Sequence, residues 1–370
     1  MKKVLGGLMG VLVATAVVVP AAANSRGPGP QRIEVSTEAG LGRVEVAGDL
    51  AAVLQRDEGA VALLSLKGGR AKLLGRYDDD IPDSFDGDLA FSDDRRWLFY
   101  ARQTHRFSKD GIHVLDVTDP AAPRLAFYQP QGGTLRIAYW NDGASEWIFT
   151  LDAIHGLVTN RFEPTTGALV PVHVSPLPAL KVGGPASAGL VVDPKDPQTG
   201  APMLYVSTGR TGVQIYDISD PVNPVEVGAW SEETGLAELQ VSALGTSRTI
   251  YAATEYWFNK QLAPEVIVLD ATDLGAIEEV DRFSIGAPAQ DAWRVQGMEL
   301  WGDLLYVAHS QAGVIVFNGQ SGKVVDRIKL SGKPNAGHPF VGAKSMAFDV
   351  DVAAKRLFAT DAVTGLLTIF

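Results

Sequence analysis

The chain alternates short apolar runs with polar turns, and one such pattern returns at a nearly constant interval. It reads Gly111-Ile-His-Val-Leu-Asp-Val-Thr-Asp-Pro-Ala-Ala-Pro123, then Gly212-Val-Gln-Ile-Tyr-Asp-Ile-Ser-Asp-Pro-Val-Asn-Pro224, and in a worn form Glu265-Val-Ile-Val-Leu-Asp-Ala-Thr-Asp273. Shorter apolar runs of the same kind begin at Gly59, Gly156, Gly313 and Gly365. The seven starting positions lie 45 to 56 residues apart, and this interval indicates a fold built of stacked repeats.

Each repeat predicts four β-strands. Residues 44–55 align without gaps on residues 298–309, and both segments read as strand, Gly-Asp turn, strand. We name these strands a and b, the apolar run that follows them c, and the strand after the Asp-Pro turn d. The c runs are almost continuously apolar, which is typical of strands that are buried on both faces. We therefore predict an all-β, seven-bladed β-propeller of four-stranded antiparallel blades, with an open solenoid as the alternative.

The two ends of the chain predict how the ring closes. The last repeat stops at Phe370, after strand c, while a spare strand-like stretch, Arg32–Thr37, precedes the first strand a. Pairing of this stretch beside residues 365–370 would complete the seventh blade. A closed ring has no open sheet edge through which chains could aggregate.

The first residues have the pattern of a secretory signal peptide. Lys2 and Lys3 precede an apolar run from Val4 to Val19, and Ala21-Ala-Ala23 supplies a cleavage site. The alternative is an uncleaved anchor, but the run is shorter than the ~20 residues that span a bilayer. We expect residues 1–23 to be the signal peptide, 24–31 a linker and 32–370 a single propeller domain. The protein would then be exported, to the periplasm or the medium, with no membrane span left.

Composition narrows the classes of partner. The formal net charge of −11 argues against nucleic acid and anionic membrane surfaces. The absence of cysteine excludes disulfides, c-type haem and thiol catalysis. No metalloprotease, phosphate-loop or dinucleotide motif is present, so the sequence names no cofactor and predicts no metal ligand. We expect a monomer.

The two best copies, Gly111–Pro123 and Gly212–Pro224, resemble the LVIVD-type repeat of secreted and cell-surface bacterial propellers, a relative of YVTN-type blades. The resemblance implies a propeller fold and an extracytoplasmic location, and it implies no reaction. The copy at Gly156–Pro164 departs from it, because it lacks the Asp-x-Thr-Asp-Pro signature.

Two groups of acidic residues allow more than one interpretation. The pairs Asp116/Asp119, Asp217/Asp220 and Asp270/Asp273 could suggest the two carboxylates of a glycosidase. Because they recur at one place in three repeats, we interpret them as turn-forming residues. The stretch from Asp78 to Asp88 is either a solvated loop or a calcium site, and the sequence does not decide between them.

In a propeller the b–c and d–a connections emerge on one face, around the central channel. A polar residue is expected where each strand b ends, at Gln55, Gln103, Asp152, Thr208, Thr254, His309 and Asp361. On the same face we expect His105, His155 and His338. Histidines beside carboxylates are able to serve acid–base chemistry, although scattered loop histidines are common.

Four cations stand at or just before the start of a strand a: Arg43, Arg136, Arg294 and Lys344. They either converge on a small anionic ligand or pair with acids such as Asp86, Glu238 or Asp291. A long b–c loop carries Glu255-Tyr-Trp-Phe258, whose Trp257 is suited to contact a ligand or a partner protein.

We therefore expect a propeller that binds a small anionic ligand or a protein partner at the b–c loop face and channel mouth, without identified catalysis. The predicted ligand-binding residues are Arg136, Arg294, Lys344, His309, Asp361, Asp152, His155 and Trp257. The alternative is an exported hydrolase or lyase that uses His309 or His155 with Asp361 or Asp152. A cofactor-binding, dehydrogenase-like propeller ranks third, because blade-docking tryptophan repeats are missing.

Overall fold

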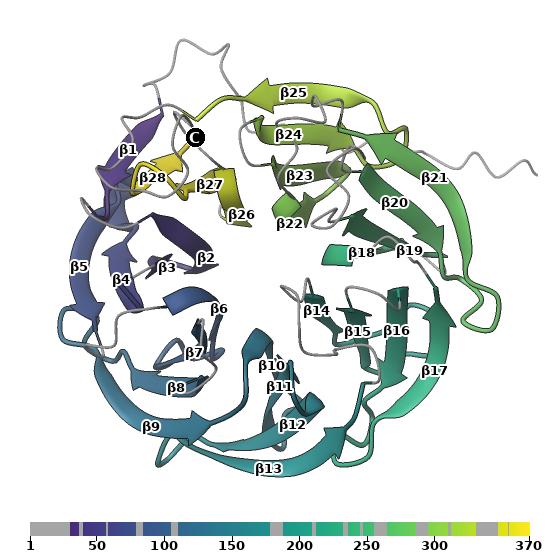
Figure 1. Ribbon diagram of the computed structural model, residues 1–370, viewed down its shortest axis with the longest axis horizontal. Helices are drawn as coiled ribbons and strands as arrows, with labels where there is room; N and C mark the ends of the chain where they lie inside the picture. The colour runs from purple at the N-terminus through teal and green to yellow at the C-terminus, as the bar shows by residue number, and fades with distance from the viewer. Residues whose placement is uncertain are drawn as a thin grey trace, which may run out of the picture.

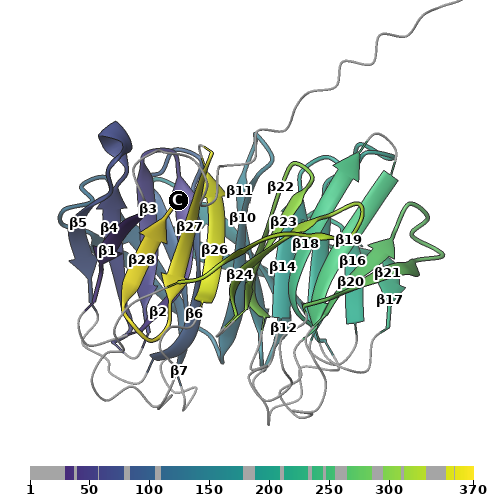
Figure 2. The same ribbon diagram turned by 90° about the horizontal axis from the view of Figure 1, so that it is seen from above.

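Seven four-stranded antiparallel sheets stand around a common axis, which confirms the predicted seven-bladed propeller (Figures 1 and 2). The computed structural model describes residues 30–36, 40–56, 58–78, 84–104, 110–177, 188–208, 212–231, 236–244, 247–254, 265–285, 295–309, 312–330, 347–353 and 355–370. Within these ranges the one helical element is a single turn, η1 (Lys67–Gly69).

In the order a to d, the strands of each blade are as follows. Blade 1 contains β2 (Leu41–Ala47), β3 (Leu50–Gln55), β4 (Ala60–Ser65) and β5 (Lys72–Tyr77). Blade 2 contains β6 (Ser84–Phe91), β7 (Trp97–Thr104), β8 (Gly111–Asp116) and β9 (Arg124–Pro130). Blade 3 contains β10 (Thr134–Asn141), β11 (Glu146–Asp152), β12 (Gly156–Glu163) and β13 (Ala168–Ser175). Blade 4 contains β14 (Ala188–Asp193), β15 (Met203–Thr208), β16 (Gly212–Asp217) and β17 (Val225–Trp230).

Blade 5 contains β18 (Leu236–Leu244), β19 (Ser247–Thr254), β20 (Glu265–Asp270) and β21 (Glu278–Ser284). Blade 6 contains β22 (Val295–Trp301), β23 (Leu304–His309), β24 (Gly313–Asn318) and β25 (Val324–Ile328). Blade 7 contains β26 (Ala347–Ala353), β27 (Arg356–Asp361), β28 (Leu366–Ile369) and, as its outermost strand, β1 (Gln31–Glu34). The innermost strands face the axis and the d strands form the rim (Figure 1).

The ring closes as the sequence predicted. Strand β1 pairs antiparallel with β28, with Gln31 opposite Ile369 and Glu34 opposite Leu366. Val35 N–H continues the ladder by donating to the Gly365 carbonyl at 3.0 Å. The side chain of Val35 packs in the apolar cluster between blades 7 and 1. The N-terminal strand therefore supplies both the hydrogen bonds and the apolar contacts that blade 7 lacks.

The core consists of layers between neighbouring blades rather than of one central body. Alternate side chains of the b and c strands point into the layers on either side of a blade. On β7, Leu98 and Tyr100 pack against blade 1, whereas Phe99 and Ala101 pack against blade 3. This double burial explains why the c runs are apolar without interruption.

Each outer strand from blade 1 to blade 6 carries a β-bulge at the same level. The register of the c–d ladder shifts once per blade, for example between Val114 and Leu115 and between Ile215 and Tyr216. A bulge bends an edge strand and makes it a poorer template for another chain. The repeated bulge thus protects the outer strands from pairing with another chain.

The repeated aspartates build turns, as interpreted from the sequence. The first carboxylate of each pair accepts the N–H group two residues ahead, as in Asp217 to Ser219 at 2.8 Å. The second does the same, as in Asp220 to Val222 at 3.2 Å. These Asx turns fix the c–d connections of blades 2, 4 and 5.

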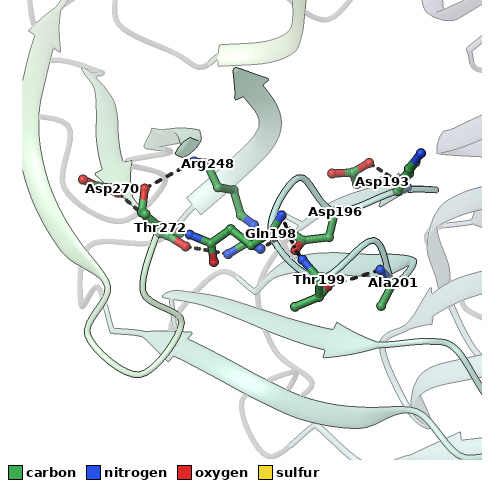
Figure 3. Close-up of polar contacts among 10 residues, drawn as sticks. Asp193, Asp196, Gln198, Thr199, Ala201, Arg248, Asp270 and Thr272 are labelled. Atoms are coloured by element: carbon green, nitrogen blue, oxygen red, sulfur yellow. Dashed lines mark hydrogen bonds and ion pairs between the residues drawn. The ribbon is translucent and has the colours of Figure 1, made fainter. Parts of the chain in front are cut away.

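One a–b connection is longer than the others and docks on the next blade (Figure 3). It runs from Asp193 to Met203 and brings Asp196 against Arg248 of β19, and both side chains are fully buried. Arg248 also donates to the Ala271 carbonyl at 2.5 Å, while Asp196 accepts Thr199 N–H at 2.8 Å. Burial lowers the pKa of the Arg248 guanidinium, and the nearby Asp193 charge opposes this shift.

Removal of the closing strand should open the ring. Deletion of residues 24–36 should lower the thermal midpoint sharply and promote self-association, because β28 and the apolar layer beside it lose their cover. Ile33→Asp should act in the same direction, whereas Arg32→Ser, on the exposed side of the same strand, should not. Calorimetry and light scattering test this, and a monomeric deletion variant with an unchanged midpoint would contradict the role of β1.

Loss of charge at Asp196 should be costly. Asp196→Asn keeps an oxygen for Thr199 N–H but leaves a buried guanidinium unpaired, so we expect a loss of about 3–5 kcal/mol in the free energy of unfolding. The double variant Asp196→Leu/Arg248→Met should lose far less, because no charge stays buried. Urea denaturation measures both, and equal losses would show that the ion pair is not the cause.

Candidate functional site

The two faces of the ring differ in how their connections vary. On one face, the c–d turns of blades 2, 4 and 5 have equal length. In blade 2, β8 ends at Asp116 and β9 begins at Arg124, and the c and d strands of blades 4 and 5 are separated by the same number of residues. On the opposite face, β9 ends at Pro130 and β10 begins at Thr134, whereas β25 ends at Ile328 and β26 begins at Ala347. The long connection between β14 and β15 apart, the largest differences in length therefore occur on the face of the b–c and d–a connections.

Five of the polar residues predicted at the ends of the b strands lie there, and these five are buried. Gln55, Asp152, Thr254, His309 and Asp361 are the last residues of β3, β11, β19, β23 and β27. Thr208 ends β15, and its side chain lies outside the described part of the chain. Most of these side chains are engaged with nearby backbone. Gln55 donates to the Val35 carbonyl, and Thr254 Oγ1 accepts Glu265 N–H.

Asp152 and Asp361 hold the b–c turns of their blades. Asp152 Oδ1 accepts the N–H groups of Ile154 and His155 at 2.8 and 2.7 Å. Asp361 Oδ1 accepts those of Val363 and Thr364 at 2.9 and 3.1 Å. The two residues occupy equivalent positions and make equivalent contacts, so their first role is to fix these turns.

In blade 2 the predicted position was wrong by one residue. Arg102, not Gln103, pairs with the glycine that opens strand c, in the way that His309 pairs with Gly313. Side chains alternate along a strand, so Gln103 points to the other side of its sheet. The error arose because β7 continues to Thr104, two residues past the one that pairs with the opening glycine, whereas β23 ends at that residue. The fully buried Arg102 takes the place in the ring.

His309 is fully buried, and neither ring nitrogen has a hydrogen-bond partner in the described structure. Burial, with a smaller contribution from Arg327, lowers the pKa of its imidazole to about 4. The side chain is thus neutral at physiological pH. It is not paired with Asp361, so the described geometry does not bring these two candidates together.

His155 and Asp152 are brought together. His155 Nδ1 lies 2.9 Å from Asp152 Oδ1, with the imidazole half exposed and the carboxylate buried. A buried carboxylate that orients an accessible imidazole is an arrangement suited to proton transfer. It is the one pair from the hydrolase alternative that the described residues support.

Two of the four predicted cations, Arg43 and Arg136, lie near the start of inner strands, as expected. Arg43 and Arg136 are third in β2 and β10, and both are buried. Arg43 Nη1 lies 3.2 Å from Asp349 Oδ1, so this cation is engaged by a carboxylate of blade 7. Arg136 Nη1 donates to the Leu135 carbonyl at 2.8 Å. Arg294 and Lys344 lie outside the described residues, directly before β22 and shortly before β26.

Other predicted positions also lie outside the described residues. They are Trp257, His105, His338 and most of the acidic stretch after Asp78. Asp78 itself pairs with Arg76 at 2.8 Å. Among the described residues, no group of three or more histidine or acidic side chains is placed to hold a metal ion.

Sequence reasoning missed a set of carboxylates on the inner strands. Three of them accept N–H groups from the inner strand of the next blade. Asp349 receives Val44 N–H at 3.0 Å, and Asp351 receives Val46 N–H at 2.7 Å. Asp88 receives Ile137 N–H at 3.0 Å. Strand a has no partner strand on its axial side, so these carboxylates satisfy donors that would otherwise face the axis unpaired.

The inner carboxylates raise one another's pKa values. Burial is the first cause for Glu45, and the charges of Asp351, Asp88, Glu299 and Asp349 add to it. Burial likewise raises the pKa of Glu299. It also raises the pKa of Asp351 to about 7, against the opposing effect of the N–H groups of Val46 and Val352. The sequence feature that could have revealed these carboxylates is the spacing of acidic residues two apart in an a strand, as in Asp349 and Asp351.

Blades 6 and 7 approach each other closely at Gly297. A Cβ atom on Gly297 would overlap the Asp349 carboxylate, so only glycine fits beside it. Gly297 lies two residues before Glu299 on β22. The inner strands of blades 6 and 7 therefore meet where the Asp349 side chain packs against the backbone of Gly297.

The raised pKa of Asp351 gives a defined dependence of stability on pH. A carboxyl whose pKa is higher in the folded than in the unfolded state stabilises the fold most below its unfolded value of ~4. That contribution should be lost as the pH rises toward 7. Asp351→Asn keeps an acceptor for Val46 N–H, so it should flatten this loss. Thermal midpoints at pH 5 and pH 8 measure the effect, and an equal slope in both proteins would contradict it.

Comparison with known proteins supports the fold and assigns no function. No family model and no curated protein matches the chain. No helix among the described residues is long and apolar enough to cross a membrane. Among solved structures, the chain is similar to a functionally unknown protein from Desulfotomaculum acetoxidans DSM 771. The two share 15% sequence identity over 78% of this chain and 85% of that chain, with a TM-score of 0.58.

Proposed function

We propose that the chain is an exported, non-catalytic binding propeller of the LVIVD- and YVTN-like kind. It takes up a small anionic ligand or a protein partner at the face of the b–c and d–a connections. The observation that carries this proposal is the wider spread of connection lengths on that face, while on the opposite face the c–d turns of blades 2, 4 and 5 repeat one geometry. In repeat proteins, insertions gather on the face that binds.

The ends of the b strands support binding rather than catalysis. Asp152 and Asp361 are committed to turns, Gln55 and Thr254 bond to backbone, and His309 is closed off from solvent. These contacts fix the ends of the b strands and the short b–c turns of blades 3 and 7. A preformed surface binds with a smaller loss of conformational entropy.

The charges of the inner strands define where an anion would sit. Arg43 precedes Glu45 by two residues on β2, so the cation lies nearer the mouth and the carboxylate deeper. Deeper in the channel, an anionic ligand would add its charge to carboxyl groups that already disfavour ionisation, those of Glu45, Glu299 and Asp351, and it would therefore stay at the mouth. There Arg136, with Arg294 and Lys344 as predicted partners, would supply charge-assisted hydrogen bonds.

The hydrolase alternative keeps one specific observation, the contact of His155 with Asp152 at 2.9 Å. In that function the buried carboxylate would orient the imidazole, and the exposed imidazole would move the proton. His309 has no such partner among the described residues, and so the alternative rests on His155 alone.

Titration of the protein lacking residues 1–23 tests the binding proposal. The probes are inorganic phosphate, succinate and citrate, measured by calorimetry. Arg136→Ala and Arg294→Ala should each weaken the best probe at least about tenfold, which corresponds to one charge-assisted hydrogen bond. Arg124→Ala is the matched control, since Arg124 is an exposed arginine at the c–d end of blade 2. Affinities unchanged in both arginine variants would reject an anion site at the mouth.

The alternative has a separate readout. If His155 transfers protons, Asp152→Asn and His155→Gln should abolish turnover of an ester or glycoside substrate while leaving its affinity nearly intact. Asp152→Asn retains an oxygen for the turn N–H groups, so the loop should persist. Turnover that survives both substitutions would exclude this pair as catalytic.

A further inference from the structure

A cavity of about 440 Å³ opens on blade 3, on the face opposite the proposed binding face. It lies between the β10–β11 turn and the β12–β13 turn, and its walls include Ser145, Glu146, Arg161 and Glu163. Its volume falls within the range of ~300–1,000 Å³ that small-molecule sites occupy. Neither the repeat nor the proposed function accounts for it.

Both turns that form the walls are internally braced. Asp142 Oδ1 accepts the N–H groups of Ala144 and Ser145, both at 2.7 Å, and Asp142 Oδ2 accepts Trp147 Nε1–H at 2.8 Å. Across the cavity, the Glu163 carbonyl accepts Gly167 N–H at 2.9 Å. The walls are therefore set before any ligand arrives, which is the condition for a preformed site.

Several polar groups of the lining keep hydrogen-bonding capacity. Arg161 uses Nε to bind Glu163 Oε1 at 3.0 Å, and within the described structure its Nη groups have no further partner. Glu146 uses Oε2 to accept Tyr139 O–H at 2.8 Å. The Ser145 hydroxyl, one Glu146 oxygen and one Glu163 oxygen make no contact among the described residues. The cavity thus offers donors and acceptors side by side.

The charges favour an uncharged ligand. An anion would meet Glu146 and Glu163, with Asp93 and Asp94 close enough to raise the pKa of the Glu146 carboxyl. A cation would meet the guanidinium of Arg161 and leave its N–H groups unsatisfied. Hydroxyl groups both donate and accept, so a polyhydroxylated molecule is able to satisfy the arginine, the serine and both carboxylates together.

We infer that this cavity on blade 3 is a second binding site, and that it takes a neutral saccharide unit. Arg161 donates to the ring or hydroxyl oxygens, and Glu146 and Glu163 accept from hydroxyl groups. Pro164, which also lines the cavity, supplies apolar contact for the C–H surface of a sugar, while the ring of Phe162 packs inward against Trp97 and Phe99. The site is independent of the mouth of the ring and of any charge gathered there.

Saturation-transfer NMR with defined probes tests the inference. The probes are glucose, galactose, mannose, N-acetylglucosamine and maltose, with spermidine as the cationic and citrate as the anionic comparison. We expect at least one sugar to bind, and Arg161→Ala and Ser145→Ala each to weaken it several-fold, at least tenfold for the arginine. Arg124→Ala, an exposed arginine at the same face of blade 2, should leave the affinity unchanged.

Three results would overturn the inference. They are no sugar bound at concentrations up to about 50 mM, sugar binding that is equal in Arg161→Ala and the wild type, and tighter binding of spermidine or citrate that Arg161→Ala alters. Circular dichroism of each variant establishes that the blade is intact. The side chains of Arg161 and Ser145 make no contact in the described structure that the fold requires beyond the exposed Arg161–Glu163 pair. Their replacement should therefore leave the fold unchanged.

Discussion

Every blade of this protein is apolar on both faces, and this constraint governs the rest of the structure. A four-stranded sheet with two apolar faces has no stable solvated form, so each blade must lie between two others. A row of blades would leave two faces open at its ends, and a ring leaves none. The pairing of β1 with β28 is the point at which the row becomes a ring. The layers between blades, the order of the strands and the position of the axis all follow from it.

Charged residues connect blades that are far apart in the sequence. Arg43 and Asp349 are separated by 306 residues and meet between blades 1 and 7. Asp196 and Arg248 meet between blades 4 and 5, where water is excluded. Buried charges add little net stability compared with apolar contacts, but an unpaired one is costly. They therefore penalise any assembly in which a blade meets the wrong neighbour, while the apolar layers supply the attraction.

The repeat made the fold predictable, since period, strand pattern and turn chemistry all pointed to one architecture. Glycines before the c strands take the left-handed conformation that other residues avoid, with φ of 91° at Gly156 and Gly212. The interpretation of Asp217 and its counterparts as turn residues succeeded for the same reason, because the N–H donor lies only two residues from the carboxylate that accepts it.

The site was less predictable because its contacts are not local. The partner of Arg43 comes from the last blade, and no spacing in the sequence points to it. The inner carboxylates look like ordinary solvent-facing positions of a strand, although Asp88 and Asp351 satisfy backbone donors of the neighbouring blade. Alignment by repeat also failed at Gln103, since β7 continues past Arg102, the residue that pairs with Gly111, and the predicted position was displaced by one residue. The cavity on blade 3 lies between two turns that depart from the repeat consensus, so the repeat pattern could not predict it.

The closing strand also imposes an order of events on synthesis. Residues 31–34 leave the ribosome long before their partners, residues 366–369. Until those partners are made, the β1 segment has no strand to join and blade 7 is not formed. Native closure therefore waits for the synthesis of residues 366–369, and the pairing of segments so distant in sequence makes it slow. A chain interrupted before Leu366 carries a N-terminal strand that finds no native place.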